Sequence, residues 1–527
     1  MVQTLSRRNL LSLAAAAGMA PVLTGEARAA TALKFGPARA FSYESLKAMA
    51  RERAGKAYVA PPRPNPEIVA RIDYDNHGKL RFNKDFALFG AGPGAYPVTF
   101  QHVGQYFAKT VRMHALAGGQ AREIIYDNSY FTIQPDHPAA KLPAEPSAFA
   151  GLWLQEARSR DWRTEEPWAT WLGASYFRAV GELGQVGLSA RGIALSPGQG
   201  PGPEEFPDFV AFWIETAEKE TDPVTLYALL DGPSLTGAYR FQCRRTTGVI
   251  MDIEATLNFR TRITHLGVAP LTSMYWYSET TTSRTIDWRP EVHDSDGLAI
   301  WTGAGERIWR PLNNPPRTMT SSFVDHGPRG FGLLQRDREF LHYLDGVKYE
   351  KRPSAWVEPL GDWGRGAVQI VELPTDDEIH DNIVAMWVPE EASEPGSSRE
   401  YRYRLHWLAD EPAPTPLARV VATRLGRGGQ PGQPRPPGVR KFLVEFKGGP
   451  LVNLPKGLIP EPVLSASRGT FGDYKYTEAV PDDVPGHWRT QFDLKVEGSE
   501  PVEMRCYLKV GDQVASETWL YQYHPPA

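Results

Sequence analysis

Apolar and polar residues alternate along several short stretches of the chain. From Met251 to Phe259, apolar and polar residues alternate with the two-residue period of a strand that buries one face. In Tyr401–Trp407, one face is aromatic or aliphatic and the other is basic. We therefore predict strands at 249–259 and 401–407.

One stretch near the start has helical spacing. Leu46, Met49 and Ala50 make an apolar stripe within 43–54, and Ser42 stands where a helix N-cap is expected. Prolines follow soon after this stretch, and the pattern then changes to short strands. We predict one short helix at 43–54 in a chain that is otherwise β.

The C-terminal part shows the same strand signals after an interruption. Residues 411–439 are rich in proline and glycine, which we interpret as a linker that cannot sustain a ladder or a helix. Beyond it, Phe442, Val444 and Phe446 alternate with polar residues, and Met504–Val510 leads through a Gly-Asp turn into 514–523 as a hairpin. A small immunoglobulin-like sandwich over 440–527 fits this pattern.

Composition supports a mainly β fold. Aromatic residues suit pleated surfaces, and the 48 Gly and 46 Pro suit turns between short strands. A length of 527 residues favours two domains, so we expect a large β-sandwich at 30–410, the linker, and the small sandwich.

Charge and cysteine content narrow the function classes. A formal net charge of -4 gives no basic footprint for nucleic acid. We interpret Cys243 and Cys506 as two free buried thiols, with one disulfide as the alternative. The chain has no CxxC, HExxH or Cys/His cluster, so we predict neither a metal nor another cofactor.

The first 29 residues have the pattern of an export signal. Arg7 and Arg8 precede a weakly apolar run, and Ala27-Arg28-Ala29 offers small residues for cleavage. We predict export to the periplasm through the twin-arginine translocase, with an ordinary secretory signal as the alternative. No later stretch is apolar enough to span a membrane, so we expect a soluble protein that is not membrane-embedded.

Two acidic loops are the candidates for chemistry. The first, 289–298, carries Asp294 and Asp296, and the second, 374–382, carries Asp381. Hydrolysis of a glycosidic bond commonly uses one protonated and one ionised carboxyl group. Such clusters are more often solvated or structural, and part of the first loop is also similar to a calcium-binding loop.

Aromatic and basic residues crowd the same region. Flat aromatic rings stack on sugar rings, and arginines can bond sugar hydroxyls, although each residue taken singly is more often core packing or a loop contact. The predicted substrate contacts are His293, Trp301, Trp309, Arg310, Tyr349, Arg352, Trp356 and Trp387.

Several runs in fixed order resemble the bacterial periplasmic glucan biosynthesis proteins of the G and D type. The runs are 269–274, 289–298, 309–315, 330–335, 352–359 and 381–384. The twin-arginine leader and Asp296 favour the D type.

The resemblance implies a large sandwich similar to galactose mutarotase, joined to an immunoglobulin-like domain. It implies a role in shaping β-1,2-glucan, and its members are similar to inverting endo-β-1,2-glucanases. By position, it implies Asp381 as general acid and Asp294 as general base acting through water. Two alternatives stay open: a transglycosylase that forms cyclic or remodelled glucans, and a non-catalytic partner of the membrane glucan synthase.

Overall fold

Two large β-sheets pack against each other around the main hydrophobic core. The computed structural model describes residues 32–90, 96–156, 161–199, 204–215, 217, 219, 221–281 and 287–526. The predicted export signal, 1–29, lies outside these residues. Within the described part of the chain, no helix combines the length and apolar character needed to cross a membrane.

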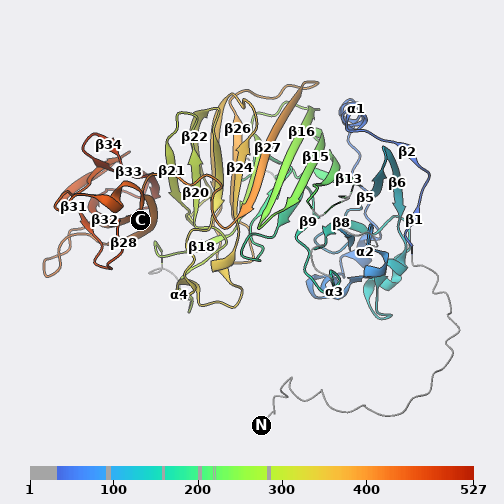
Figure 1. Ribbon diagram of the computed structural model, residues 1–527, viewed down its shortest axis with the longest axis horizontal. Helices are drawn as coiled ribbons and strands as arrows, with labels where there is room; N and C mark the ends of the chain where they lie inside the picture. Colours follow the sequence, from blue (N-terminus) through green and yellow to red (C-terminus); the bar gives the residue numbers. More distant parts are fainter. Residues whose placement is uncertain are drawn as a thin grey trace, which may run out of the picture. The chain divides into compact units, whose positions relative to one another are not determined.

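The first sheet carries the longest strands, and β15, β16 and β27 run side by side in it (Figure 1). In hydrogen-bonded order its strands are β6 (Gln120–Ile125), β5 (Arg112–Ala117), β13 (Asp208–Glu215), β14 (Val224–Asp231), β15 (Leu235–Arg245), β16 (Val249–Phe259), β27 (Ser398–Leu408), β24 (Ser354–Pro359), β23 (Gly330–Leu334), β20 (Gly297–Trp301) and β21 (Arg307–Pro311). The short strands β1 (Lys34–Phe35) and β2 (Arg39–Ala40) pair with β6. The predicted strands at 249–259 and 401–407 are confirmed as β16 and part of β27.

The second sheet covers the apolar face of the first. Its order is β22 (Met319–His326), β25 (Arg365–Glu372), β26 (Ile383–Pro389), β17 (Leu266–Ser273), β11 (Ser189–Arg191), β10 (Tyr176–Ala179), β9 (Ala169–Leu172), β8 (Phe149–Leu154) and β4 (Val98–His102), and β12 (Ile193–Leu195) also pairs with β17. Trp171 of this sheet meets Phe241 of the first with ring centroids 5.7 Å apart. Both belong to one buried cluster, so the two sheets share a single core.

Short elements connect and flank these sheets. They are the helices α1 (Tyr43–Ala54), α2 (Pro66–Val69), α3 (Tyr74–Lys79) and α4 (Phe340–Tyr343), and the two-stranded pairs β3 (Arg81–Phe82) with β7 (Phe131–Thr132) and β18 (Tyr275–Tyr277) with β19 (Val292–His293). The predicted helix at 43–54 is confirmed as α1, and its Ser42 cap accepts a hydrogen bond from the backbone of Ser45. Leu46 and Ala50 are buried, whereas Met49 faces solvent.

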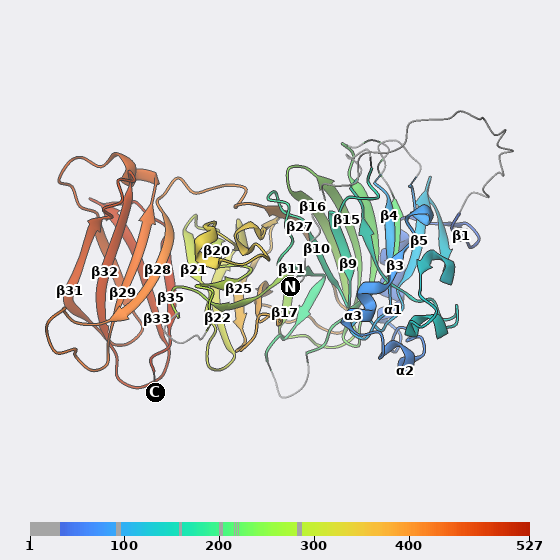
Figure 2. The same ribbon diagram turned by 90° about the horizontal axis from the view of Figure 1, so that it is seen from below.

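The C-terminal region is a smaller sandwich. One sheet has the order β28 (Arg419–Arg427), β29 (Val439–Lys447), β32 (His487–Lys495) and β31 (Thr470–Ala479) (Figure 2). Facing it are β30 (Glu461–Ala466), β33 (Val502–Val510), β34 (Gln513–Val514) and β35 (Thr518–Tyr523). Phe442 and Phe492 stack at 5.5 Å in the core of this sandwich. The predicted hairpin after residue 504 is confirmed in β33 to β35, and the fold class, a large β-sandwich followed by a smaller one, is confirmed.

The interpretation of 411–439 as a segment unable to form a ladder is wrong for part of it. Strand β28 lies inside that range and pairs with β29. Its residues include several β-branched side chains, and the proline and glycine clusters lie mainly on either side of it, so composition averaged over the whole segment hid the strand.

The small sandwich is hydrogen-bonded to the large one. Strand β35 runs parallel to β21, with Trp309 paired to Trp519, and residues 33–527 form one compact unit. The division into two domains at 411–439 therefore stays a prediction. Cys243 and Cys506 are both free and buried, which confirms the prediction of two free thiols.

Candidate functional site

Asp294 lies in the short loop between β19 and β20. The backbone N–H of Asp294 donates to the carbonyl of Met274 at 2.9 Å, which ties this loop to the start of β18. The carboxylate is buried and Arg352 Nε lies 3.0 Å from its Oδ1. Burial raises the pKa of Asp294 to about 6 against the opposing effect of Arg352. This carboxyl group can therefore exchange its proton near neutral pH.

Asp381 ends the loop between β25 and β26. The side chain of Asn382 anchors the loop because it accepts from the N–H of Tyr275 at 2.8 Å and donates to the carbonyls of Tyr275 and Leu373. Asn314 clamps the other end through both the N–H and the carbonyl of Thr375. Two buried or half-buried amides thus fix the loop on either side of its acidic residues.

Asp381 is an exposed residue, but its carboxyl group has protein on several sides. Partial burial raises its pKa, whereas the charges of Arg191 and Arg178 lower it. Arg178 stands on β10, and Arg191 on the neighbouring β11. Arg191 is held in place by Thr272 at 2.8 Å and Glu204 at 2.7 Å.

The two acidic loops are electrostatically coupled. The negative charge of Asp381 contributes to the raised pKa of Asp294, and Arg178 interacts with both carboxylates. Charges at a protein surface are largely screened beyond about 10 Å at 0.1 M salt, so effects of this kind are short-ranged. Two carboxyl groups separated by 87 positions in the chain thus share one environment lined by arginines.

A network of hydrogen bonds fixes the loops around this pair. Arg289 donates to Asp287, to Asp345 at 2.8 Å and to Glu378 at 2.7 Å, and so ties three segments together. The hydroxyl of Tyr349 donates to the same Glu378 carboxylate at 2.5 Å. The guanidinium group of Arg352 lies over the Tyr349 ring at 5.3 Å, so Tyr349 and Arg352 both border Asp294.

Several predicted substrate contacts are core residues. Trp309 and Trp356 belong to the core of the small sandwich, and Trp387 to the main core. Protein covers their rings, so we do not retain them as sugar contacts. Trp301 is half-buried between Arg307, at 3.7 Å from its ring, and Arg329, at 5.3 Å.

Arg310 and His293 also have structural partners. Arg310 is buried in an ion pair with Glu372 at 2.8 Å. His293 is fully buried, with one ring nitrogen 3.0 Å from Glu291 and the other 3.0 Å from Gln335. Of the predicted substrate contacts, Tyr349, Arg352 and the buried His293 border Asp294.

A second group of titratable side chains lies beside His293. Glu291, Asp337 and His342 place their ligand atoms within 4.8 Å of one another, which is close enough for a metal ion. His342 and Asp337 bond each other at 2.5 Å, and Glu291 bonds His293. Burial and the charge of Asp337 raise the pKa of Glu291 to about 8. Because each side chain has a protein partner, we assign no ion to this group.

Sequence reasoning missed the arginines of the second sheet. Arg178 and Arg191 lie about 100 to 200 positions from either acidic loop. The alternation of Tyr176, Phe177 and Arg178 indicates a strand with one polar face, but it does not say that this face meets Asp381. Glu378 was visible as part of an acidic loop without a role.

Comparison with known proteins places this arrangement in a family. A family model described as "Periplasmic glucan biosynthesis protein, MdoG" matches residues 41–523. The chain is 59% identical over 528 residues to glucans biosynthesis protein D 2 of Ralstonia nicotianae, covering 99% of this chain and 98% of that protein.

Two further relatives have the same description. Glucans biosynthesis protein D of Xanthomonas axonopodis pv. citri is 44% identical over 534 residues, covering 99% of this chain and 98% of the relative. The protein of that name from Stenotrophomonas maltophilia is 45% identical over 498 residues, covering 94% and 91%. These matches confirm the resemblance noted from the residues: the chain belongs to the MdoG family of periplasmic glucan biosynthesis proteins and has a role in periplasmic glucan biosynthesis.

Proposed function

We propose that the protein cleaves β-1,2-glucan internally with inversion, using Asp381 as general acid and Asp294 as general base through water. The proposal is supported by one arrangement: buried Asp294, 3.0 Å from Arg352, shares an arginine-lined environment with Asp381, an exposed residue of a distant loop. The β-1,2 linkage and the two roles come from the family resemblance. We further propose that residues 1–29 direct export through the twin-arginine translocase.

The two carboxyl groups have different cationic neighbours, although burial raises the pKa of both. Asp294 has a direct cationic partner, Arg352, at 3.0 Å, which favours its ionised form, the form a base requires. Arg191 and Arg178 lower the pKa of Asp381 through their nearby charges, whereas burial raises this pKa and favours the protonated form. A general acid at Asp381 would give its proton to the leaving sugar oxygen, and Asp294 would take a proton from the attacking water.

The arginines and Tyr349 would act on the substrate and on the geometry. Arg178 is exposed beside Asp381, where its guanidinium group can donate to sugar hydroxyls. Tyr349 bonds Glu378 and lies next to Asp294, so it can hold an intervening water in line. Arg289 keeps the three loops together and is a positioning residue.

The experiment is an incubation of the purified protein with linear β-1,2-glucan, with product lengths and product anomers followed in time. We expect shorter linear products whose anomeric configuration is opposite to that of the substrate. Asp381→Asn should lower the rate by about 10²–10⁴-fold, the usual contribution of general acid catalysis. Asp376→Asn is the matched control, because Asp376 is exposed on the same loop and should leave the rate nearly unchanged.

Three outcomes would contradict the proposal. Full activity of Asp381→Asn would remove the assigned acid. Cyclic or length-conserved products would indicate transglycosylation at the same site. Tight glucan binding without any change of chain length would indicate a non-catalytic partner of the glucan synthase.

A further inference from the structure

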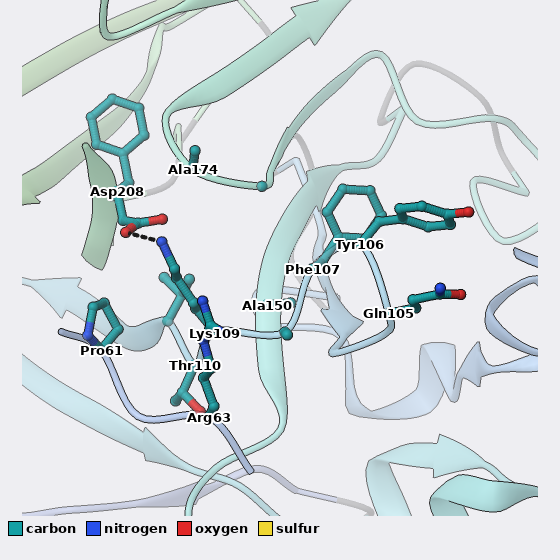
Figure 3. A pocket seen from close by; sticks show the side chains of 14 residues that line it. Pro61, Arg63, Gln105, Tyr106, Phe107, Lys109, Thr110, Ala150, Ala174 and Asp208 are labelled. Atoms are coloured by element: carbon teal, nitrogen blue, oxygen red, sulfur yellow. Dashed lines mark hydrogen bonds and ion pairs between the residues drawn. The ribbon is translucent and has the colours of Figure 1, made fainter. Parts of the chain in front are cut away.

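A cavity lies apart from the carboxyl pair, with walls from both large sheets. Its volume is about 240 Å³. The loop 105–111 after β4, the turn 173–174 between β9 and β10, and the start of β13 at Asp208 line it, together with Pro61 and Arg63 (Figure 3). Pockets for drug-sized ligands measure roughly 300–1,000 Å³, so this one suits a single ring and not a longer oligomer.

The two sides of the cavity differ in chemistry. Lys109 donates to Asp208 at 2.6 Å on one side, and Gln105, Tyr106 and Phe107 stand on the other (Figure 3). The Lys109 and Asp208 charges neutralise each other, and the exposed Arg63 adds one positive charge, so this wall offers several polar atoms. A sugar ring has hydroxyl groups on its edge and apolar C–H groups on its faces, and it suits a cavity with one polar and one aromatic side.

Tyr106 is unusual for its exposure. Tyr106 is 70% exposed, although burial of an aromatic ring is energetically favourable. The next residue, Phe107, is half-buried and lies against Gly173 and His77, so the loop is held while Tyr106 stays exposed. An exposed ring on a fixed loop is available to stack on a ligand at little cost in lost freedom.

One wall of the cavity is joined by the chain to the surroundings of the carboxyl pair. Its turn 173–174 leads directly into β10, and Arg178 on that strand interacts electrostatically with Asp381. Ala174 and Arg178 are four residues apart, so they lie at most about 13 Å from each other, the span of four fully extended residues.

Helix α3 also links the cavity to the surroundings of Arg178. His77 packs on Phe107 with ring centroids 5.7 Å apart, while Tyr74 of that helix is 81% exposed and close enough to Arg178 to affect its pKa. Exposed tyrosines therefore stand at both ends of this path.

We infer that the cavity beside Tyr106 is a remote subsite, which binds one sugar unit of the same glucan chain whose other units reach Asp381. The inference takes its ligand from the proposed function, but it does not require that the chain is cleaved. Tyr106 stacks on the sugar face, and the polar side with Lys109 and Asp208 bonds the hydroxyls. The subsite selects long glucans over short ones, because only a long chain spans both places.

The test uses the full chain with Asp381→Asn, which holds glucan without cleaving it. Isothermal titration calorimetry compares a long linear β-1,2-glucan with a β-1,2-linked trisaccharide. Adding Tyr106→Ala should weaken binding of the long glucan by about three- to tenfold, the usual worth of one aromatic contact, and leave trisaccharide binding unchanged. Tyr106→Phe is the matched control, because it keeps the ring and should bind like the parent. Since Tyr106 is exposed, the thermal unfolding midpoint should not change in either variant.

Two results would overturn the inference: unchanged binding of the long glucan by Tyr106→Ala, or an equal loss for both ligands. Failure of the proposed cleavage looks different. In that case the unmodified protein leaves glucan intact, while the length-dependent effect of Tyr106→Ala is still observed. Cleavage by the unmodified protein together with a silent Tyr106→Ala would reject the subsite alone.

Discussion

Arg310 was a candidate sugar contact, and the structure makes it one half of a buried ion pair. Arg310 and Glu372 have side chains that are each 1% exposed. The guanidinium group donates to both carboxylate oxygens, at 3.2 and 2.8 Å, and the backbone N–H of Asn313 donates to the same carboxylate at 2.7 Å. Glu372 ends β25, so the pair holds the start of the loop that carries Asp381.

Arg310→Met should destabilise the protein by about 3–5 kcal/mol at neutral pH, because it leaves an uncompensated buried carboxylate. Burial raises the pKa of Glu372 and Arg310 lowers it, so the variant should have a still higher pKa at this group. An acid whose folded pKa is raised above its ordinary value of 4.5 contributes stability at low pH that is lost as pH rises through the folded pKa. The variant should therefore lose less stability at pH 5 than at pH 7.

The assay is urea unfolding followed by circular dichroism at both pH values. The double variant Arg310→Met/Glu372→Gln is the control: it removes the charge and keeps an oxygen for Asn313, so it should recover more than half of the lost free energy of unfolding. An unchanged midpoint for Arg310→Met together with a raised KM for glucan would refute this reasoning and restore the role in sugar binding. A double variant as unstable as the single one would also contradict it.

Three further predictions concern the carboxyl pair and the cysteines. The pH profile of kcat/KM on glucan should be bell-shaped, because activity needs an ionised Asp294 and a protonated Asp381 and burial raises the pKa of both groups; a flat profile between pH 4 and 9 would contradict it. Arg352→Met removes the cation 3.0 Å from Asp294, so the pKa of Asp294 should rise and the limb of the pH–rate profile that reports this group should move to higher pH. Arg352→Lys should keep most of the effect, and the pH–rate profiles of both variants measure this. Cys243 and Cys506 should resist thiol reagents in the native protein, because both are buried and burial raises the pKa of each thiol. Both should react in concentrated urea, as measured by mass spectrometry. Labelling of the folded protein, or a disulfide on a non-reducing gel, would contradict this prediction.

Local patterns in the sequence determined much of the fold. The helix at 43–54 and the strand at 249–259 were predicted with correct bounds, because a cap and a period of apolar residues act within one element. The acidic loop at 374–382 was visible for the same reason. Strand β28 was missed because its own residues were outnumbered by the prolines and glycines around it.

Tertiary structure decided which residues share the environment of Asp381. Trp309 and Trp387 are buried, while Tyr106 is exposed, and no feature of an aromatic residue's immediate neighbours tells these states apart. Arg178 meets Asp381 because β10 and the loop before β26 belong to one sheet, which brings together positions about 200 residues apart. Periodicity reports which face of an element is polar. What that face meets depends on strand pairing across the whole chain, and this is the part that only the folded structure supplies.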